Sequence, residues 1–352
     1  AMASLGIPTT RALAACTTGQ PVIRETILPG AVLTRVALSH IRVGTFWYFA
    51  ARQDVEALKT LSNYAIDRLY PEAKQADNPV QALISQVCRA QAELIADWMS
   101  VGFIHGVMNT DNMAISGETI DYGPCAFMDE FHPSTVFSSI DRAGRYAWSN
   151  QPQIAYWNLA QLAQSLLPIL HADQKEAIEL AQQALNPFLE WHRAAFRQRF
   201  NAKLGLQAFE EGDEELLQDL FQVMVSQKMD FTNTFRSLSS LSESPSEDHP
   251  LVEWSRKWRL RLNLEVKFGR LKDFSDLETL MNQTNPAFIP RNHLVEAAIQ
   301  QSLTANEGEQ DFSIFYELLK QSKAPFSELP SDSNLGNPPA AEERVMQTSC
   351  GT

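Results

Sequence analysis

The stretch His105-Gly-Val-Met-Asn-Thr-Asp-Asn-Met-Ala-Ile-Ser-Gly-Glu-Thr-Ile-Asp-Tyr-Gly123 decides how this chain is interpreted. It contains an Asp111-Asn112 pair and an Asp121-Tyr-Gly123 triplet, and the residues between them include Ser116-Gly-Glu118, which is typical of a tight turn. Short apolar runs flank this turn and predict an antiparallel hairpin that places residues 112 and 121 opposite each other. Amide and carboxylate oxygens are the ligands that Mg²⁺ and Mn²⁺ take in phosphate chemistry, so Asn112 and Asp121 are candidate metal ligands.

The order of these residues matches the metal-binding half of a protein-kinase active site, except that the acid stands at a different position. A kinase catalytic loop reads H-x-D-x-x-x-x-N, and a D-F-G triplet follows it. His105 and Asn112 have this spacing, and Asp121-Tyr-Gly123 stands in the place of D-F-G. Val107 occupies the position of the kinase base and cannot accept a proton, whereas an acid occurs at Asp111. We expect His105 to pack and hydrogen-bond beneath the D-Y-G triplet without taking part in the chemistry.

Further segments connect this pattern to a known family. They are Leu5-Gly-Ile-Pro-Thr-Thr-Arg-Ala12, Leu33-Thr-Arg-Val-Ala37, Ser39-His-Ile-Arg-Val-Gly44, Arg145-Tyr146, Asn150-Gln-Pro152, Trp157-Asn-Leu159, Asn285-Pro286 and Pro290-Arg-Asn-His293. With the 105–123 stretch they resemble selenoprotein O and its bacterial relatives, a kinase-like family, over nearly the whole chain. The resemblance implies that ATP binds in a flipped orientation and that AMP is transferred to Ser, Thr or Tyr hydroxyls of proteins, with UMP transfer as a variant.

The resemblance also assigns roles to individual residues. It implies that Asp111 is the catalytic base, that Asn112 and Asp121 hold Mg²⁺ or Mn²⁺, and that Asp121 also faces the nucleotide. Arg35 and Arg42 resemble the two family arginines that contact the ATP phosphates. A guanidinium suits that role because it stays charged and binds phosphate oxygens in pairs.

The chain departs from the family at its beginning. No G-x-G-x-x-G precedes His105, and the first lysine is Lys59, whereas family members carry a Gly-rich phosphate loop, a nucleotide lysine and a glutamate that pairs with it. We therefore expect a truncated N-lobe and impaired transfer by this chain. Two alternatives stay open, a phosphotransferase and a non-catalytic pseudokinase scaffold, because the spacing alone does not separate attack on the α-phosphorus from attack on the γ-phosphorus.

These observations predict an α+β, protein-kinase-like fold with a mainly helical C-lobe. We divide it into an N-lobe remnant (residues 1–43), a C-lobe (44–237) with an activation-loop region at 124–152, a C-terminal helical extension (238–323) and an extended tail (324–352). Strand-like runs at 22–26 and 31–36 are separated by a predicted turn at Pro29-Gly30. Helical spacing predicts helices at 54–70, 79–101, 155–170, 173–199, 213–227, 250–268, 274–282, 291–304 and 309–321.

Two other segments, and the tryptophans as a group, have compositional signals. The Ser-rich stretch from Ser237 to Ser246 predicts an exposed linker, and the acidic run from Glu210 to Glu215 predicts a solvated face. The tryptophans at 148, 157, 191, 254 and 258 are expected to pack in the core or between helices.

Composition limits the choice of partners. The chain has 352 residues and a net charge of −13, which argues against nucleic-acid binding through a general basic field, while a local positive pocket around Arg35, Arg42 and Arg142 is compatible with ATP. No apolar run reaches the ~18 residues of a membrane span, and no secretory signal is recognised. The expected partners are therefore ATP and protein substrates with accessible hydroxyls, with no nucleic acid and no membrane.

The four cysteines are scattered and contain no C-x-x-C or zinc spacing. Free thiols in a reducing compartment are predicted, the cytoplasm or, for a eukaryotic protein, the mitochondrion. Cys350 lies where the resemblance places a redox-active residue of the family. A regulatory pairing of Cys350 with Cys125 is a hypothesis, since sequence does not give disulfide geometry.

Overall fold

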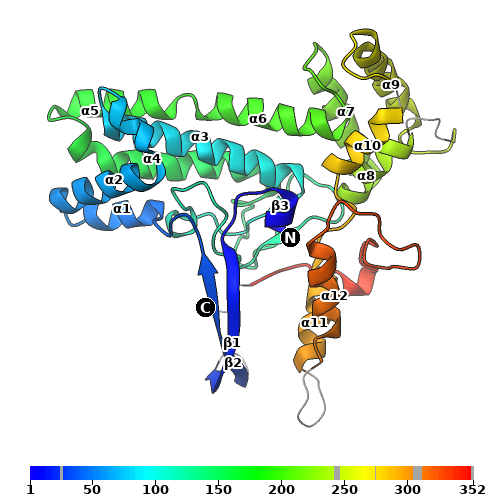
Figure 1. Cartoon of the computed structure of the whole chain (residues 1–352), viewed down its shortest axis with the longest axis horizontal. Helices are drawn as coiled ribbons and strands as arrows, with labels where there is room; N and C mark the ends of the chain where they lie inside the picture. Colours follow the sequence, from blue (N-terminus) through cyan, green and yellow to red (C-terminus); the bar gives the residue numbers. More distant parts are fainter. Residues whose placement is uncertain (24–26, 242–245, 274, 304–310, 350–352) are drawn as a thin grey trace.

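The structure is a computed structural model that describes residues 1–23, 27–241, 246–273, 275–303 and 311–349. Helices dominate, and short antiparallel strand pairs complete an α+β fold. A helical layer contains α1 (Val43–Ala50), α2 (Val55–Leu69), α3 (Pro79–Ser100), α4 (Gln151–Leu170), α5 (Gln174–Leu185) and α6 (Phe188–Lys203), as Figure 1 shows. The predicted helices at 54–70, 79–101 and 155–170 are confirmed, whereas α1 has no counterpart in the prediction.

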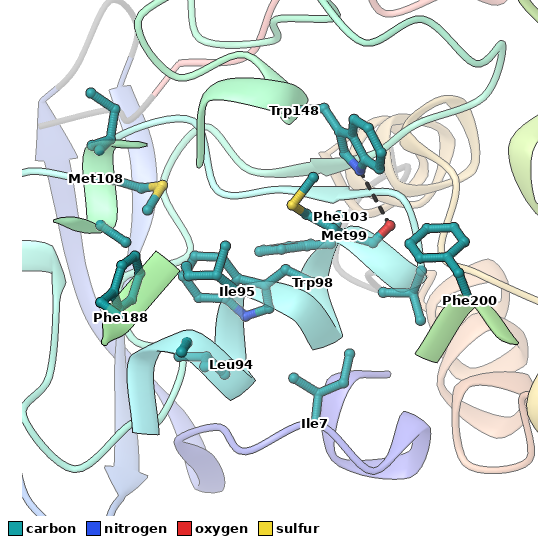
Figure 2. Close-up of a cluster of buried hydrophobic side chains, with 14 of the residues drawn as sticks. Ile7, Leu94, Ile95, Trp98, Met99, Phe103, Met108, Trp148, Phe188 and Phe200 are labelled. Carbon is teal, nitrogen blue, oxygen red and sulfur yellow. Dashed lines mark hydrogen bonds between the residues drawn. The ribbon is translucent and has the colours of Figure 1, made fainter. Parts of the chain in front are cut away.

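Helix α3 supplies the centre of the core. Asn78 caps its first turn by accepting a hydrogen bond from the Gln81 amide at 3.0 Å, and Gly102, with φ of 69°, follows its end. Its apolar side chains recur at helical spacing, so one face packs against α4, α5 and α6. Trp98 is 2% exposed, and Figure 2 shows it among Leu94, Met99, Phe103 and other buried side chains.

The N-terminal strands form a hairpin that extends away from the helical layer (Figure 1). Strand β1 (Arg11–Ile23) pairs antiparallel with β2 (Ile27–Val36), while residues 24–26 lie outside the described part of the chain. The predicted turn at Pro29-Gly30 is wrong, because both residues belong to β2 and Pro29 lies opposite Pro21. A two-stranded ribbon tolerates these prolines because each strand has a free edge. Val32, Leu33 and Val36 are more than half exposed.

The middle of the chain is helical, as predicted, with two differences. The helix expected at 173–199 is two helices, α5 and α6, because Pro187 removes a backbone donor between them. The expected linker from Ser237 is helical to Leu241, within α8 (Phe231–Leu241), and residues 242–245 are outside the described part. Phe231, Phe235 and Leu238 form a buried apolar stripe on α8, and the hydroxyls of Ser237 and Ser240 donate to carbonyls of the same helix. The high serine content suggested a linker and obscured the helical spacing of these apolar residues.

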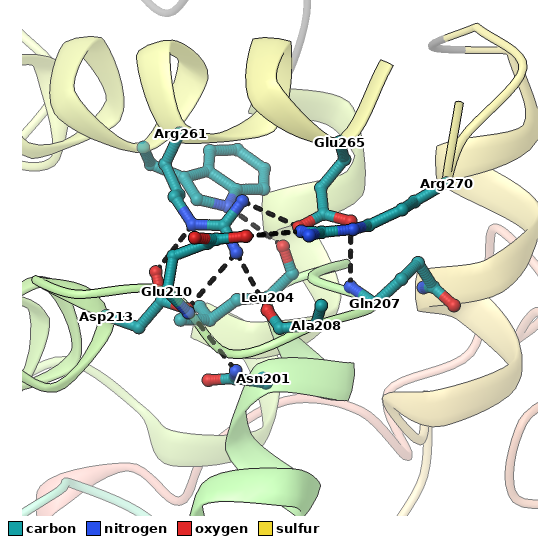
Figure 3. A network of polar contacts seen from close by, with 10 residues as sticks. Asn201, Leu204, Gln207, Ala208, Glu210, Asp213, Arg261, Glu265 and Arg270 are labelled. Atoms are coloured by element: carbon teal, nitrogen blue, oxygen red, sulfur yellow. Dashed lines mark hydrogen bonds and ion pairs between the residues drawn. The ribbon is translucent and has the colours of Figure 1, made fainter. Parts of the chain in front are cut away.

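A buried ion network joins α7 (Asp213–Ser226) to α9 (Val252–Lys267), as Figure 3 shows. Arg261 contacts both Asp213 and Glu265 at 2.6 Å and donates to the Ala208 carbonyl at 2.8 Å. Asp213 is 2% exposed, so the prediction of a solvated acidic run is wrong at this position, although Glu211, Glu214 and Glu215 are exposed. The network fixes the loop that leads from α6 into α7.

The C-terminal part returns to the centre of the molecule. Helix α10 (Ser275–Thr284) packs on α8, and α11 (Asn292–Leu303) pairs with α12 (Ser313–Ser322) around a small second core of Phe288, Ala298 and Leu318. Beyond α12 the described chain, as far as residue 349, consists of irregular segments and turns, including the 3₁₀ turn η5 (Ala341–Glu343). Thr348 there bonds to Phe137 and Ser139 of the activation-loop region at 2.7 and 2.9 Å.

Candidate active site

The Asp111-Asn112 pair lies in a short, well-anchored loop. It follows β3 (Phe103–Ile104), which pairs with β4 (Ala126–Phe127), and forms the 3₁₀ turn η3 (Thr110–Asn112). The Asn109 side chain caps the turn by accepting from the Asp111 amide at 2.9 Å. The Asn112 side chain donates through Nδ2 to the Val107 carbonyl at 3.0 Å, which orients its amide.

Asn158 supports the same loop from α4. It is fully buried, and its Nδ2 donates to the Met108 carbonyl at 2.8 Å. Sequence reasoning did not assign it a role, although it stands in the Trp157-Asn-Leu159 segment that carried the family resemblance. A buried asparagine within an apolar helical stretch was the available signal, because such a group needs partners.

His105 lies fully buried beneath the D-Y-G triplet, as predicted. Its Nε2 is 2.8 Å from the carbonyl oxygen of Ile120, the residue before Asp121. Burial lowers the pKa of His105, so the ring is neutral and Nε2 carries the proton that it donates. The histidine therefore has a structural role and fixes the approach to Asp121.

The predicted hairpin around Ser116-Gly-Glu118 is wrong in its pairing. A tight turn is present, with Gly117 N donating to Ala114 O at 3.2 Å, but the two arms pair with segments near the N-terminus. The first arm pairs with residues 41–43, through Val43 N to Met113 O and Ile115 N to Ile41 O, both 3.0 Å. Across the other arm, Thr10 N donates to Thr119 O at 3.1 Å.

This pairing brings Arg42 to the catalytic loop. Arg42 forms an isolated antiparallel bridge with Ala114 and is also the N-cap residue of α1. Its Nε is buried and has no hydrogen-bond partner among the described residues. A buried guanidinium nitrogen without a partner is costly unless a ligand satisfies it, which agrees with a phosphate-binding role.

Arg42 and Asp111 line the same open pocket of ≈ 600 Å³. The wall between them is Gly44, in the first turn of α1. An ideal Cβ on Gly44 would lie 2.0 Å from Asp111 Oδ1, so only glycine lets the carboxylate approach this closely. Sequence reasoning did not assign a role to Gly44. Its position two residues after Arg42, a proposed phosphate ligand, was the feature that could have marked it.

The structure places Arg35 elsewhere. It lies on β2, is exposed, and pairs with Ala12 across the hairpin. It is not among the described residues that line the Asp111 pocket. It does lie near the D-Y-G triplet: burial raises the pKa of Tyr122 to about 12, and the Arg35 guanidinium opposes this shift.

Asp121 adopts an unusual backbone conformation, with φ of 59°. A non-glycine residue in this left-handed region is uncommon, and such conformations gather at functional sites. Its side chain is half-buried, and no described residue forms an ion pair or hydrogen bond with it. Next to it, the Tyr122 hydroxyl is hydrogen-bonded to Thr9.

The donor set of Asn112 and Asp121 fits a hard divalent cation. Because Asn112 Nδ2 faces Val107, its Oδ1 is the atom left for a ligand, and Asp121 adds an anionic carboxylate. Among the described residues, no group of three or more His, Cys, Asp or Glu side chains could hold a metal. One carboxylate and one amide suit Mg²⁺, which takes few protein ligands and completes its shell with phosphates and water.

A second ion network connects the end of β4 with the C-terminal part. Arg291 is 1% exposed and contacts Asp129 at 2.5 Å and Asp230 at 2.7 Å. It also donates to the Gly336 carbonyl at 3.0 Å. Burial raises the pKa of Asp129, and the Arg291 charge opposes this. Arg291 thus joins the activation-loop region, α8 and the tail.

The described cysteines are free, as predicted. Cys16 is exposed, Cys88 is buried and Cys125 is half-buried, and burial raises the pKa of Cys125 to about 12. Cys350 lies outside the described residues, so its pairing with Cys125 stays a hypothesis. The preceding Thr348 donates to the Pro124 carbonyl at 2.5 Å.

Comparison with known proteins identifies the family. The family model described as protein adenylyltransferase SelO matches residues 1–323. Proteins named protein nucleotidyltransferase YdiU are similar over all of this chain: that of Bradyrhizobium diazoefficiens is 49% identical, that of Rhizobium etli 50% and that of Rhodopseudomonas palustris 51%. The chain covers 72%, 71% and 72% of these relatives. These names describe catalysts and give no support to a non-catalytic scaffold. Because the family model matches most of its length, the chain belongs to the SelO family of protein adenylyltransferases.

Proposed function

We propose that this protein transfers AMP from ATP to Ser, Thr or Tyr hydroxyls of other proteins, with UMP from UTP as the alternative donor. The observation that carries the proposal is the shared pocket of Asp111 and Arg42, which combines an exposed carboxylate with a guanidinium whose Nε has no partner among the described residues. A proton acceptor and a phosphate ligand are the two groups that nucleotidyl transfer needs in one place. The similarity to adenylyltransferases directs the attack to the α-phosphorus.

In this proposal Asp111 accepts the proton of the attacking hydroxyl. Its carboxylate is exposed to the pocket, lies against Gly44, and is held by the capped turn at Asn109. Arg42 binds the outer phosphates and stabilises the departing pyrophosphate. Arg35 is assigned to the same phosphates from the other side, which agrees with its proximity to Tyr122 in the D-Y-G triplet.

Asn112 and Asp121 would hold Mg²⁺ or Mn²⁺, with Asp121 also facing the nucleotide. The bound cation would neutralise phosphate charge. The chain contributes the orientation of these ligands: Val107 fixes the Asn112 amide, and the His105–Ile120 hydrogen bond fixes the backbone before Asp121.

We further propose a protein-kinase-like fold with the division already given: 1–43 as an N-lobe part, 44–237 as the C-lobe, 238–323 as a helical extension and 324–352 as a tail. The order of α3, the loop with His105 and the D-Y-G triplet supports this proposal. Helix α8 passes through residue 238 without a break, so the extension is continuous with the C-lobe at that point. A reducing compartment, the cytoplasm or a mitochondrion, is proposed from the free cysteines. No helix of the described residues has the length and apolar character of a membrane span.

Intact-protein mass spectrometry tests the function directly. A substrate protein is incubated with this protein and ATP, or with UTP, in the presence of Mg²⁺ or Mn²⁺. We expect a slow mass gain of one AMP (or UMP), in keeping with the impaired transfer expected from the sequence, and its loss in the Asp111→Asn variant. A gain of one phosphate would identify a phosphotransferase, and an unchanged mass with every acceptor would refute the proposal.

A further inference from the structure

Three exposed aromatic side chains lie around the pocket that contains Asp111. Trp47 and Tyr48 on α1 and Trp157 on α4 are 55%, 48% and 42% exposed, and all three line the Asp111 pocket. The prediction that Trp157 packs in the core is therefore wrong, whereas Trp148, Trp254 and Trp258 are at most 4% exposed. Single exposed aromatics are ordinary, but several on one pocket are typical of protein-binding sites, where Trp and Tyr are frequent anchors.

Arginines cover these rings. The Arg52 guanidinium lies 3.5 Å from the centre of the Tyr48 ring, and the Arg145 guanidinium lies 5.0 Å from the centre of the Trp157 ring. Both side chains are exposed, and Arg42 and His40 line the same pocket. Stacking on an aromatic ring orients a guanidinium while leaving its edge free to bind oxygen atoms.

The Arg52 guanidinium donates one hydrogen bond to the Tyr48 carbonyl at 3.0 Å, and neither Arg52 nor Arg145 has a carboxylate partner within the described ranges. Elsewhere in the protein, arginines such as Arg199, Arg261 and Arg291 form ion pairs with Asp or Glu. Asp111 is the single acid among the described residues that line the pocket. The chain has a net charge of −13, so this aromatic surface, whose arginines have no acidic partner, is a locally positive region on a negatively charged protein.

We propose that the surface formed by Trp47, Tyr48, Arg52, Arg145 and Trp157 binds an acidic segment of the protein substrate and presents its hydroxyl to Asp111. This inference rests on the proposed function and adds the chemical class of the acceptor. The rings contact the backbone and apolar atoms of the segment, and the arginines pair with its Asp or Glu side chains. An acidic segment is favoured over a nucleic acid because nucleic-acid binding depends on many phosphate contacts, whereas this surface offers two arginines.

The pocket geometry supports acceptor binding beside the nucleotide. Arg42 lines the Asp111 pocket, whereas Arg52 and Arg145 are not among its lining residues and lie over the rings of Tyr48 and Trp157. The phosphates and the acidic segment therefore use different arginines. Changes at Arg52 and Arg145 should weaken acceptor binding and leave ATP binding unchanged.

Fluorescence anisotropy with the full chain tests the inference without requiring catalysis. The probes are three labelled peptides with a central tyrosine flanked by glutamates, by glutamines or by lysines. We expect the glutamate peptide to bind best and its affinity to fall with added salt. In the Arg52→Glu/Arg145→Glu variant its Kd should rise about tenfold or more, because each reversal replaces an attraction by a repulsion. The Kd for ATP, measured by calorimetry, should stay within about twofold.

A matched control carries the same change in net charge on other helices. Arg89→Glu/Arg193→Glu alters exposed arginines of α3 and α6, and it should leave peptide affinity near that of the unaltered protein. Equal losses in both variants would overturn the inference, because they would mean that only net charge matters. Equal binding of the three peptides, or preferred binding of single-stranded DNA at the same surface, would overturn it as well.

The two proposals fail separately. If AMP transfer occurs with no preference for acidic peptides, the function stands and the acceptor surface is wrong. If the glutamate peptide binds, and binding is lost in the Arg52→Glu/Arg145→Glu variant, the surface stands even when no AMP is transferred.

Discussion

Replacing Gly44 by alanine is the most direct test of how this structure positions Asp111. The new Cβ would lie 2.0 Å from Asp111 Oδ1, and real Cβ atoms almost never come closer than 3.0 Å to another atom. The exposed carboxylate must therefore move by about 1 Å, because Gly44 itself is buried in the first turn of α1. A displacement of about 1 Å at a reacting group can cost on the order of 10²-fold in rate.

Stability should not fall in parallel. Alanine is favoured over glycine within a helix by up to ~1 kcal/mol, and the clash is relieved by rotating an exposed side chain. We therefore expect Gly44→Ala to lower kcat by about 100-fold, to leave the Kd for ATP within about twofold, and to leave the melting temperature unchanged or slightly raised. The assays are AMP transfer, calorimetry with ATP, and thermal unfolding followed by circular dichroism.

A double-mutant cycle separates this effect from general damage. In an Asp111→Asn background, the same Gly44→Ala change should cost little further activity, since the group that it displaces is already inactive. An equal loss in both backgrounds, or full activity of Gly44→Ala, would show that contact with Gly44 does not control the base.

Three further predictions concern metal, pH and the ion network. Asp121→Ala should abolish Mg²⁺-dependent ATP binding, because the proposed site loses its one anionic protein ligand; unchanged affinity in calorimetry would contradict this. Burial lowers the pKa of His192 to about 4 from its ordinary 6.5, so the folded state favours the neutral ring. The stability that His192 provides is therefore present above pH 6.5 and is lost as the pH falls toward 4, by about 3 kcal/mol in all. Urea denaturation of His192→Leu should show a weaker loss across this range, and an equal loss would assign the effect to other groups. Arg261→Met should lower the free energy of unfolding by about 3–5 kcal/mol, because buried Asp213 would lose its cation and Glu265 would keep only Arg270, 3.5 Å away; a change below about 1 kcal/mol in urea would refute this.

Local patterns in the sequence were sufficient for most helices. The apolar spacing between residues 79 and 101 predicts the start and end of α3 to within a residue, because periodicity is a local property. The same reasoning failed for α8, where the serines suggested a linker and the buried stripe of Phe231, Phe235 and Leu238 decided the structure. It also failed at Asp213, since only the fold shows that Arg261 lies opposite.

The sequence pointed to candidate site residues but not to the way in which the segments around them pair. Type and spacing single out His105, Asn112 and Asp121, and the family resemblance adds Asp111 as the proposed base. The structure confirms the buried position of His105. The spacing also suggested a self-paired hairpin, which is the cheapest local solution because closing a short loop costs little entropy. The arms pair instead with segments near residues 9 and 42, and such long-range partners leave no local signal.

That long-range pairing explains why Arg42 and Asp111 line one pocket. Residues 41–43 are hydrogen-bonded to 113–115, and the chain then turns directly into α1, whose Gly44 contacts Asp111. The segment 41–44 thus contains the proposed phosphate ligand Arg42, and its Gly44 leaves room for the Asp111 carboxylate. The same segment leads into the helix that carries Trp47 and Tyr48. Because α1 also packs on α4, Trp157 reaches the same pocket from the other side. The proposed nucleotide site, the proposed base and the proposed acceptor surface therefore all contact α1. A shift of this short helix should change all three together.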